Sequence, residues 1–388
     1  MDIKIDSSEE EKLRKQLESN NDADSKRMQR FLAMPDLSRQ KGSPIAELVN
    51  KSLKTKSLSG LDVIKVPEIV PYGVSFDTFN FPKDHPARSA SDTYYVDKNN
   101  VLRTHTTVMW HYYINHPSVQ KRLKKNEVVG SVCYGKVYRK DEIDRKHMNV
   151  FHQIDGWGLY PISERKITTD DLKEILVDVA QAIFGTDIEY RFNVDSFPYT
   201  DPSVEMEIRL DDSSGEKDGA SKGWVEVLGS GIVHPNVLKN LGINPNEYNG
   251  WAFGFGLERL AILSMNLPDI RLLWSQDTRV KRQLKLGNTY EEVSKYPPIT
   301  RDISFVVNKD FVPNIYFDLI RDLGGDLVEE VKLLDTYKDD KKFGKDKISY
   351  TYRIVYRSND RTLVSEEVDK IQDEIYKQTA EQFKAELR

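Results

Sequence analysis

The sequence has little of several residues and patterns, and each shortage excludes a class of structure. Its 388 residues include one cysteine, Cys133, which excludes an internal disulfide and a zinc site built from thiolates, and fits a reducing compartment. No run of about 18 apolar residues occurs, so no transmembrane helix is expected. Neither a Walker-type glycine loop nor a GxGxxG pattern before a helix is present, so P-loop and Rossmann nucleotide sites are not expected.

The composition predicts a soluble globular protein of two domains. Hydrophobic residues make up 38% and charged residues 31% of the chain, which is ample material for a core, and the length fits two domains. The formal net charge is -5. A surface that binds nucleic acid would therefore have to be a local basic patch.

Residues 1–42 are expected to be a charged N-terminal tail. Residues 1–30 mix acidic and basic side chains with few apolar ones, which predicts a solvated helix or a disordered segment. They lack the apolar centre of a signal peptide and are too acidic for a mitochondrial presequence.

Residues 43–292 are predicted to form an α+β domain. Ser43 and Pro44 begin one helix, and Thr169 caps another that ends at Gly185. Extended segments follow one another without βαβ alternation, which predicts an antiparallel sheet flanked by helices. We expect strands over residues 63–70, 92–96, 102–107, 132–139, 150–155, 188–194, 204–210 and 224–228, with a turn at 212–219.

Residues 293–388 are predicted to form a second, ferredoxin-like domain. Strands are expected over residues 302–307, 327–337 and 347–356, and helices over 312–323 and 364–383. This βαββα order, with a short terminal strand that completes βαββαβ, is the ferredoxin-like one.

Residues 251–260 (WAFGFGLERL) pass from an aromatic strand through two glycines into a helix. Gly254 and Gly256 allow another group to approach the backbone, because neither carries a Cβ. Arg259 lies in the first helical turn, where the helix dipole disfavours a cation. A bound anion, a flat aromatic ligand or a carboxylate across a packed turn would each explain this arginine, and the pattern leaves these interpretations open.

Polar and aromatic residues two apart on strands share one face of a sheet. Such pairs are found at His105/Thr107, Arg139/Asp141, Gln153/Asp155, Phe197/Tyr199 and Glu205/Glu207. A single polar pair is ordinarily a solvated sheet face. Three mixed donor–acceptor pairs beside apolar strands predict a sheet face with hydrogen-bonding groups. Such a face suits a small polar ligand and could hold an amino group and a carboxylate. Arg139 and Arg259, if they converge, suit a phosphate chain whose charge they would stabilise.

Six segments in order resemble a known family. Residues 136–144 (KVYRKDEID) with 150–153 (VFHQ) resemble motif 2 of class II aminoacyl-tRNA synthetases, and 254–259 (GFGLER) resembles motif 3. Residues 81–88, 102–106, 197–199 and 268–274 resemble the phenylalanyl-tRNA synthetases, in particular their single-chain mitochondrial type. The resemblance spans about residue 43 to the end of the chain. It implies a class II catalytic domain and a ferredoxin-like domain that binds the anticodon.

The resemblance also implies residue roles. Arg139 and Arg259 would be catalytic, and Asp144, Arg145 and Lys146 would form the motif 2 loop. ATP would be bound by Arg139, His147, Phe151, His152, Glu226 and Arg259, with Glu226 also a ligand for Mg²⁺. Phenylalanine would be bound by His105, Thr106, Thr107, Val108, Gln153, Asp155, Phe197, Tyr199, Ala252, Phe253 and Gly254. Thr107, Trp110, Asp155 and Tyr199 depart from the commoner family pattern, which has Ser, Gln, Glu and Phe there.

The implied function is ATP-dependent attachment of L-phenylalanine to tRNA(Phe) through a phenylalanyl-adenylate, for organellar protein synthesis. The resemblance further implies that the protein is a monomer in the mitochondrial matrix and does not bind a membrane. Tyr350, Tyr352 and Tyr356 with Arg353, Arg357 and Arg361 are candidates for the anticodon surface, and ordinary strand alternation is the other interpretation of these tyrosines. Two alternative functions stay open: a class II synthetase for another amino acid, and a non-catalytic tRNA-binding paralogue.

Overall fold

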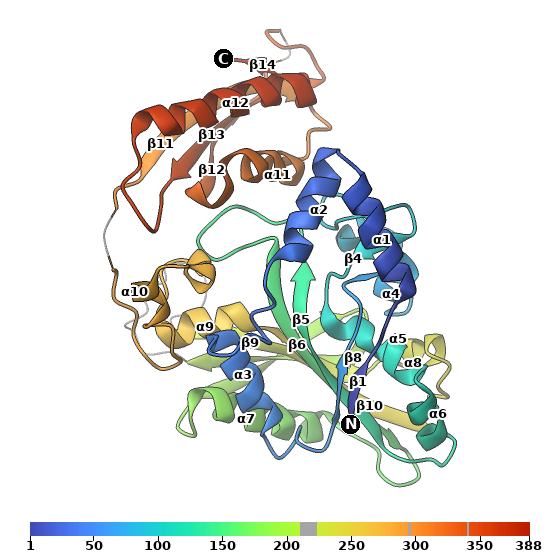
Figure 1. Ribbon diagram of the computed structural model, residues 1–388. Helices are drawn as coiled ribbons and strands as arrows, with labels where there is room; N and C mark the ends of the chain where they lie inside the picture. The colour runs from blue at the N-terminus through green and yellow to red at the C-terminus, as the bar shows by residue number, and fades with distance from the viewer. Residues whose placement is uncertain (210–222, 294–295, 340) are drawn as a thin grey trace. The chain divides into compact units, whose positions relative to one another are not determined.

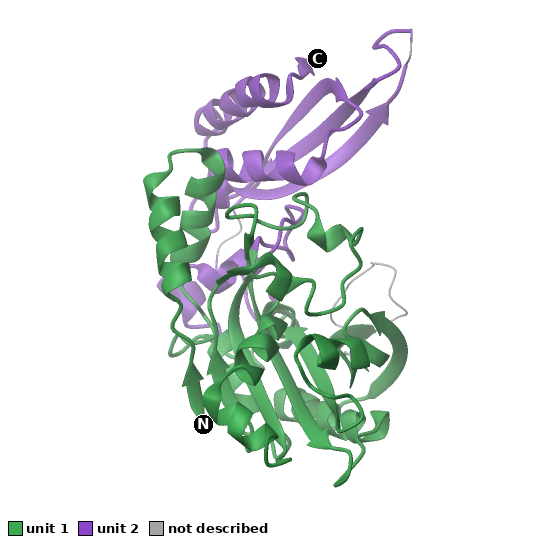
Figure 2. Cartoon of the chain, turned by 90° about the vertical axis from the view of Figure 1, so that its right-hand side faces the viewer, with its two compact units in different colours: residues 1–138, 150–266, 285–288 green, residues 139–149, 267–284, 289–388 purple. Residues whose placement is uncertain are grey.

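The computed structural model describes residues 1–209, 223–293, 296–339 and 341–388. Figure 2 shows the chain as two compact units. The first unit comprises residues 1–138, 150–266 and 285–288, and the second comprises 139–149, 267–284 and 289–388. The turn expected at residues 212–219 lies outside the described residues.

The first unit is built on one large sheet, most of whose strands are labelled in Figure 1. Its strand order is β1-β2-β5-β6-β10-β9-β8-β7. β1 and β2 run parallel to β5, and every other neighbouring pair is antiparallel. The predicted antiparallel sheet is therefore confirmed, except that β1 and β2 add two parallel pairings at one end. The strands are β1 (Asp2–Lys4), β2 (Asp62–Lys65), β5 (Val129–Tyr138), β6 (Val150–Pro161), β7 (Tyr190–Phe197), β8 (Thr200–Arg209), β9 (Trp224–Val233) and β10 (Tyr248–Gly256).

Helices pack on both faces of this sheet. One face is covered by α3 (Pro44–Leu53), α7 (Thr169–Phe184) and α9 (Leu257–Met265). α7 begins with a capping box between Thr168 and Asp171 and buries Leu172, Leu176 and Val179, as its periodicity predicts. The other face carries η2 (Thr106–Val108), α5 (Met109–Ile114), α6 (Pro117–Leu123) and α8 (Pro235–Asn240). A small sheet of β3 (Ile69–Pro71) and β4 (Asn100–Leu102) lies beside α4 (Tyr72–Ser75), and η1 (Pro86–Arg88) follows in the loop before β4.

The N-terminal residues are ordered, so the interpretation as a disordered tail is wrong. Ile3 in β1 pairs with Ile64 in β2. α1 (Ser8–Ser19) and α2 (Ala23–Ala33) bury a small set of apolar side chains against β3 and its surroundings: Leu13, Leu17, Met28 and Phe31. The alternative of a solvated helix is closer, because most of the remaining side chains of both helices face solvent. Because only a few positions of these helices are buried, their composition resembles that of a disordered tail.

Two predicted strand pairs are not on strands. His105 caps η2 and Thr107 lies within it, because the chain turns there into α5. Arg139 and Asp141 follow the end of β5 at Tyr138 and lie in the loop before β6. Gln153/Asp155 and Glu205/Glu207 do lie on strands, in β6 and β8. Phe197 ends β7, and Tyr199 lies in the turn to β8.

The second unit contains the predicted ferredoxin-like order. Its sheet is β12-β13-β11-β14, antiparallel throughout. A core of aromatic and aliphatic side chains from the strands and helices, including Phe305, Tyr316, Ile354 and Val368, holds it together. The elements are β11 (Ile299–Asn308), α11 (Pro313–Gly324), η4 (Gly325–Leu327), β12 (Val328–Tyr337), β13 (Lys347–Tyr356), α12 (Ser365–Phe383) and β14 (Glu386–Leu387), with η3 (Ile270–Trp274) and α10 (Thr278–Lys281) beforehand. Among the described residues, no helix is both long and apolar enough to cross a membrane.

Candidate functional site

The register of three strands aligns several predicted site residues on one face of the first unit's sheet. Asp155 in β6 pairs with Gly254 in β10, which pairs with Gly229 in β9. Phe151 and Gln153 lie four and two residues before Asp155 on β6, so their side chains share its face. The strands thus bring together residues that lie up to about one hundred positions apart in the sequence.

Asp155 is buried and held by its neighbours. The Thr107 hydroxyl donates to Asp155 Oδ2 at 2.5 Å. A Cβ at position 254 would overlap Asp155 Oδ1, so glycine there leaves room for the carboxylate. Thr107 thus has a partner on the sheet although it does not lie on a strand.

Gln153 supplies a buried acceptor beside this carboxylate. Its Oε1 is buried, and no donor within the described parts of the chain bonds it. A buried carbonyl oxygen without a donor carries a desolvation penalty of about 1–3 kcal/mol. A ligand that donates hydrogen bonds, such as an ammonium group, would remove this penalty.

Aromatic rings bound the same face. A Cβ on Gly229 would lie 3.0 Å from the Phe197 ring, so this glycine allows the ring to lie over β9. Phe197 and Tyr199 stack with centroids 5.7 Å apart and planes at 9°. Ala252 lies two residues before Gly254 on β10, and Tyr199 packs against the cluster that contains Ala252. Beside Phe197, residues 194–198, 200–203, Asn80 and His234 line a cavity of about 360 Å³.

Phe253 does not belong to this face, which corrects its expected place in the pocket. Its ring forms a ladder with Trp251 and Phe255, with successive centroids 5.8 and 5.9 Å apart. A Cβ on Gly156 would meet the Phe253 ring. Phe253 is one position from Gly254, so strand alternation turns its ring to the opposite face of the sheet.

His105 lies at the edge of the aromatic wall. Its Nε2 lies 3.0 Å from the Ser75 carbonyl oxygen, to which it donates as N–H, so a neutral ring keeps Nδ1 as an acceptor. The ring stacks on Phe81 at 6.0 Å and 9°, and meets Phe79 edge-on at 5.5 Å. Thr106 and Val108, the two other predicted residues of this segment, are buried.

Arg259 is half-exposed in the first turn of α9, with 58% of its side chain accessible. Its Nη1 lies 3.8 Å from Glu226 Oε2, so the interpretation as an arginine paired with a carboxylate has a partner in the structure. The pair is long, and the exposed guanidinium keeps a face open for a flat ligand. Burial raises the pKa of Glu226, with Glu205, Asp195 and Glu207 adding to the rise and Arg259 opposing it.

His152 is buried in the opposite face of the sheet. Its Nδ1 lies 2.6 Å from Glu258 Oε1, and its Nε2 accepts from the Leu37 amide at 2.9 Å. Both ring nitrogens are therefore used inside the protein. Its geometry is that of a residue that supports β6 and does not present its ring to a nucleotide.

No group of three or more His, Cys, Asp or Glu side chains in the described part of the chain has the arrangement of a metal site. Mg²⁺ in nucleotide enzymes needs only one or two carboxylates, because phosphates and water complete its shell. Glu226 beside Arg259 fits that sparser pattern.

The loop from Arg139 to Asn149, counted with the second unit, is organised by Asp144. Asp144 Oδ1 accepts from the amides of Lys146 and His147 at 2.6 and 2.7 Å, and Oδ2 lies 2.7 Å from His147 Nδ1. The hydrogen bond that His147 donates to Asp144 raises the pKa of His147. Burial alone would raise the pKa of Asp144, but the bonds from His147 and Lys146 lower it overall.

Arg145 of the same loop lies beside a buried carboxylate that the sequence did not indicate. Glu329 in β12 is 1% exposed and forms ion pairs with Arg145 and, at 2.6 Å, with Arg357. Arg271 lies 4.0 Å from the same carboxylate and also pairs with Asp269. These three arginines and Glu329 join the loop, η3 and the ferredoxin-like sheet within the second unit.

Two of the tyrosines proposed for the anticodon surface are in the core. Tyr352 and Tyr356 are fully buried, and the Tyr356 hydroxyl bonds Gln372 at 2.8 Å. Tyr350 is partly buried against the same core. Ordinary strand alternation is therefore the correct interpretation of these residues. Arg353 and Arg361 are exposed and form ion pairs with Asp302 and Glu367, whereas Arg357 turns to the buried carboxylate of Glu329.

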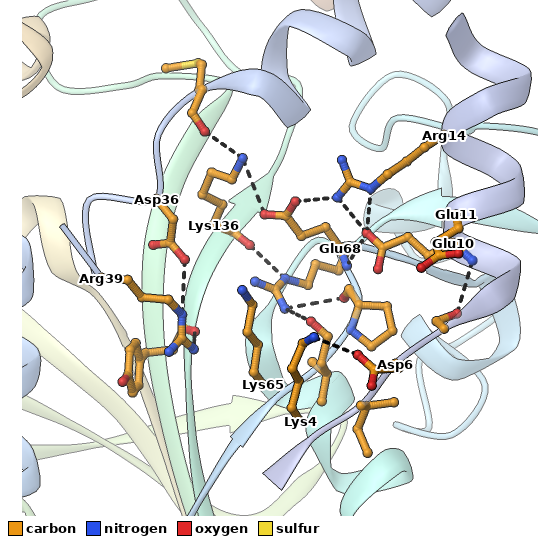
Figure 3. Close-up of a pocket in the computed structure, with 17 residues that line it drawn as sticks. Lys4, Asp6, Glu10, Glu11, Arg14, Asp36, Arg39, Lys65, Glu68 and Lys136 are labelled. Atoms are coloured by element: carbon orange, nitrogen blue, oxygen red, sulfur yellow. Dashed lines mark hydrogen bonds and ion pairs between the residues drawn. The ribbon is translucent and has the colours of Figure 1, made fainter. Parts of the chain in front are cut away.

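A charged cavity of about 360 Å³ lies between the N-terminal residues and β5, and Figure 3 shows the side chains that line it. It contains none of the predicted site residues. Glu68 lies between Arg14 at 2.7 Å and Lys136 at 3.4 Å, and Asp36 pairs with Arg39 at 3.3 Å. Lys136 also donates to the carbonyls of Leu32 and Met34 at 2.8 Å. These contacts bind the lining side chains to one another, and they hold α1 and α2 against the sheet.

Comparisons with known proteins agree with this architecture. Residues 31–284 match the family model of the tRNA synthetases class II core domain (F), and residues 294–388 match the ferredoxin-fold anticodon binding domain. The chain is similar to a chloroplastic/mitochondrial phenylalanine–tRNA ligase of Arabidopsis thaliana, with 37% identity over 82% of this chain and 71% of the relative.

Two further relatives extend the likeness beyond plants. The mitochondrial phenylalanine–tRNA ligase of Mus musculus is 34% identical over 79% of this chain and 71% of its own length. That of Saccharomyces cerevisiae is 32% identical over 81% of this chain and 80% of its own length. The chain therefore belongs to the phenylalanine–tRNA ligases, a family of class II aminoacyl-tRNA synthetases, with a ferredoxin-fold anticodon-binding domain over residues 294–388.

Proposed function

We propose that this protein attaches phenylalanine to tRNA(Phe) through a phenylalanyl-adenylate. The observation that carries the proposal is the buried Oε1 of Gln153, which lacks a donor among the described residues and lies on the sheet face that Asp155 shares. These acceptors suit an ammonium group, and the stacked rings of Phe197 and Tyr199 suit an apolar aromatic side chain. An α-amino acid with a benzyl side chain combines both features.

In the first step, a carboxylate oxygen of phenylalanine forms a bond to the α-phosphorus of ATP, and the bond to pyrophosphate breaks. Arg139 would hold the α-phosphate and the substrate carboxylate, and Phe151 and Arg259 would enclose the adenine. The exposed guanidinium of Arg259 supports that role. Glu226 would hold Mg²⁺, which neutralises phosphate charge when bound. His152 would support the strand that carries Phe151 and Gln153.

In the second step, the 2′-hydroxyl oxygen of the terminal tRNA ribose forms an ester with the activated carbonyl carbon, and AMP leaves. The chain's part in both steps is to position the reacting groups. His147 and Lys146, both exposed in the loop from Arg139 to Asn149, would contact the triphosphate or the incoming tRNA end.

The ferredoxin-like domain would bind the anticodon through its exposed strand. The second half of β12 is accessible to solvent, including Leu333 and Tyr337, and Arg353 is exposed on the neighbouring strand. Tyr337 therefore takes the stacking role first assigned to the buried tyrosines. We also propose that the protein works as a monomer in the mitochondrial matrix, as the names of its mouse and yeast relatives suggest for the organelle.

Amino-acid-dependent exchange of pyrophosphate into ATP, run with all twenty amino acids, tests the proposal. Phenylalanine should support the fastest exchange. Arg259→Ala should reduce it at least about a hundredfold, because loss of the guanidinium that encloses the adenine would misplace ATP relative to the amino acid. Fastest exchange with another amino acid would assign a different synthetase. No exchange, together with tight tRNA binding, would assign a non-catalytic RNA-binding protein.

A further inference from the structure

Arg88 lies at the end of a loop in which the proposed function assigns no residue a role. The loop runs from α4 through η1 and carries the aromatic residues Phe76, Phe79 and Phe81. The Arg88 side chain is only 7% exposed, which is unusual for an arginine on a loop. A buried guanidinium has to be compensated by specific partners.

Those partners lie between Tyr72 in α4 and Phe81 in the loop. Arg88 Nη1 donates to the Tyr72 hydroxyl at 2.8 Å and pairs with Asp77 Oδ1 at 2.8 Å. Arg88 Nη2 donates to the Phe81 carbonyl at 2.6 Å. Its Cζ lies 5.3 and 5.4 Å from the ring centroids of Tyr72 and Phe76. One guanidinium therefore ties the start of the loop to Phe81.

The backbone of Arg88 is held as well. The Tyr95 hydroxyl donates to the Arg88 carbonyl at 2.5 Å, and the Arg88 amide donates to the His85 carbonyl at 2.9 Å. Lysine could not replace this arrangement, because one ammonium point charge does not reproduce the planar fork of a guanidinium.

The loop that Arg88 ties down forms the outer layer of the amino-acid site. Phe81 stacks on His105 and lies 6.0 Å from the Tyr199 ring. Phe79 meets both His105 and Tyr199 edge-on, at 5.5 and 6.4 Å. Asn80 donates to the Pro198 carbonyl at 3.1 Å, between the two site aromatics Phe197 and Tyr199. Displacement of Phe81 would therefore displace the ring of Tyr199 and the imidazole of His105.

We infer that Arg88 is a positioning residue that sets the shape of the phenylalanine pocket, and with it the preference for phenylalanine over tyrosine. This rests on the function proposed above. Arg88 touches no substrate; it acts through Phe81 on two pocket side chains. Apolar pockets reject an added hydroxyl by only about a hundredfold, so a small shift of the wall should change this ratio measurably.

The test is pyrophosphate exchange with phenylalanine and with tyrosine, measured for Arg88→Gln and for Arg165→Gln as a control on the exposed surface of the same unit. Arg88→Gln should raise the KM for phenylalanine about tenfold and lower the phenylalanine-to-tyrosine ratio of kcat/KM, because misplaced pocket groups weaken substrate binding. The KM for ATP should change less than about twofold, and Arg165→Gln should match the wild type in every constant.

A merely structural role would lower the thermal midpoint and the active fraction, but would leave the KM for phenylalanine and the selectivity ratio unchanged, and that result would overturn the inference. If Arg88→Gln does not fold, Tyr72→Phe removes one partner of the guanidinium and should move the same two constants in the same direction by less. Unchanged constants in a folded Tyr72→Phe would then reject the inference. Wild-type protein without phenylalanine-dependent exchange would instead reject the proposed function itself.

Discussion

In the first unit, the amide oxygen of Gln153 is buried without a donor from the described residues, whereas in the second unit the buried carboxylate of Glu329 lies among three arginines. Both groups are polar and removed from water. The Glu329 carboxylate is compensated by arginines of the same protein and stabilises the fold only if these partners stay in place. The Gln153 oxygen would be compensated only when a ligand binds. Whether a buried polar group is compensated by a ligand or by the protein therefore distinguishes a binding site from a structural ion-pair cluster.

Glu329→Ala should have the largest effect and should test the structural side of this comparison. Removing one partner of a buried ion-pair cluster leaves charges uncompensated, so unfolding of the second unit should become easier by about 3–5 kcal/mol. Urea denaturation followed by circular dichroism measures this change. Glu381→Ala, an exposed glutamate on α12, is the matched control and should shift the midpoint little. Equal midpoints for both variants would remove Glu329 from this structural role.

Gln153→Met should test the binding side. Methionine has a similar volume and no polar atom that needs a partner, so the unliganded protein should be as stable as the wild type or more stable. Phenylalanine activation should fall about a hundredfold in kcat/KM, since the acceptor for the ammonium is lost. Gln181→Met on α7 controls for the substitution. A destabilised variant with normal phenylalanine kinetics would mean that Gln153 is structural, as Glu329 is.

The pair of His147 and Asp144 should give the smallest effect, because half of the His147 side chain is exposed. Asp144 raises the pKa of His147 above its ordinary value of 6.5. The stabilisation is therefore complete below pH 6.5 and is lost as the pH rises through the raised pKa. Proteolytic cleavage within residues 139–149 should become faster on going from pH 6 to pH 8. His147→Gln should remove this pH dependence; a dependence that persists would assign it to another group.

Much of the fold follows from local signals. The helix α7 was predicted from its period and is confirmed, although its N-cap is Thr168 and not the predicted Thr169. The passage from β10 into α9 was predicted from two glycines beside apolar residues, and it is confirmed too. The ferredoxin-like order is confirmed too. It could be predicted because clear turn signals separate its strands and helices. These features depend on neighbours within about ten residues, which a sequence pattern displays directly.

The face of the sheet on which a strand residue lies also follows from the sequence, because side chains alternate along a strand. Phe253 and His152 each stand one position from a residue on the site face, so alternation alone places them on the other face. The same alternation divides the tyrosines of β13 from Arg353. The resemblance to a family supplies the set of candidate site residues. The geometry of the strands then decides which of these residues lie on one face and can contact the same ligand.

The sequence by itself determined the order of elements, the two-domain division of the family and the types of residue that serve each substrate. Only the tertiary structure decided that Asp155, Gly254 and Gly229 lie in one row, that Glu329 lies among three arginines, and that Arg88 holds the loop behind the pocket. The physical reason is that strand register and the compensation of a buried charge are set by partners far away in the chain. No local pattern records those partners.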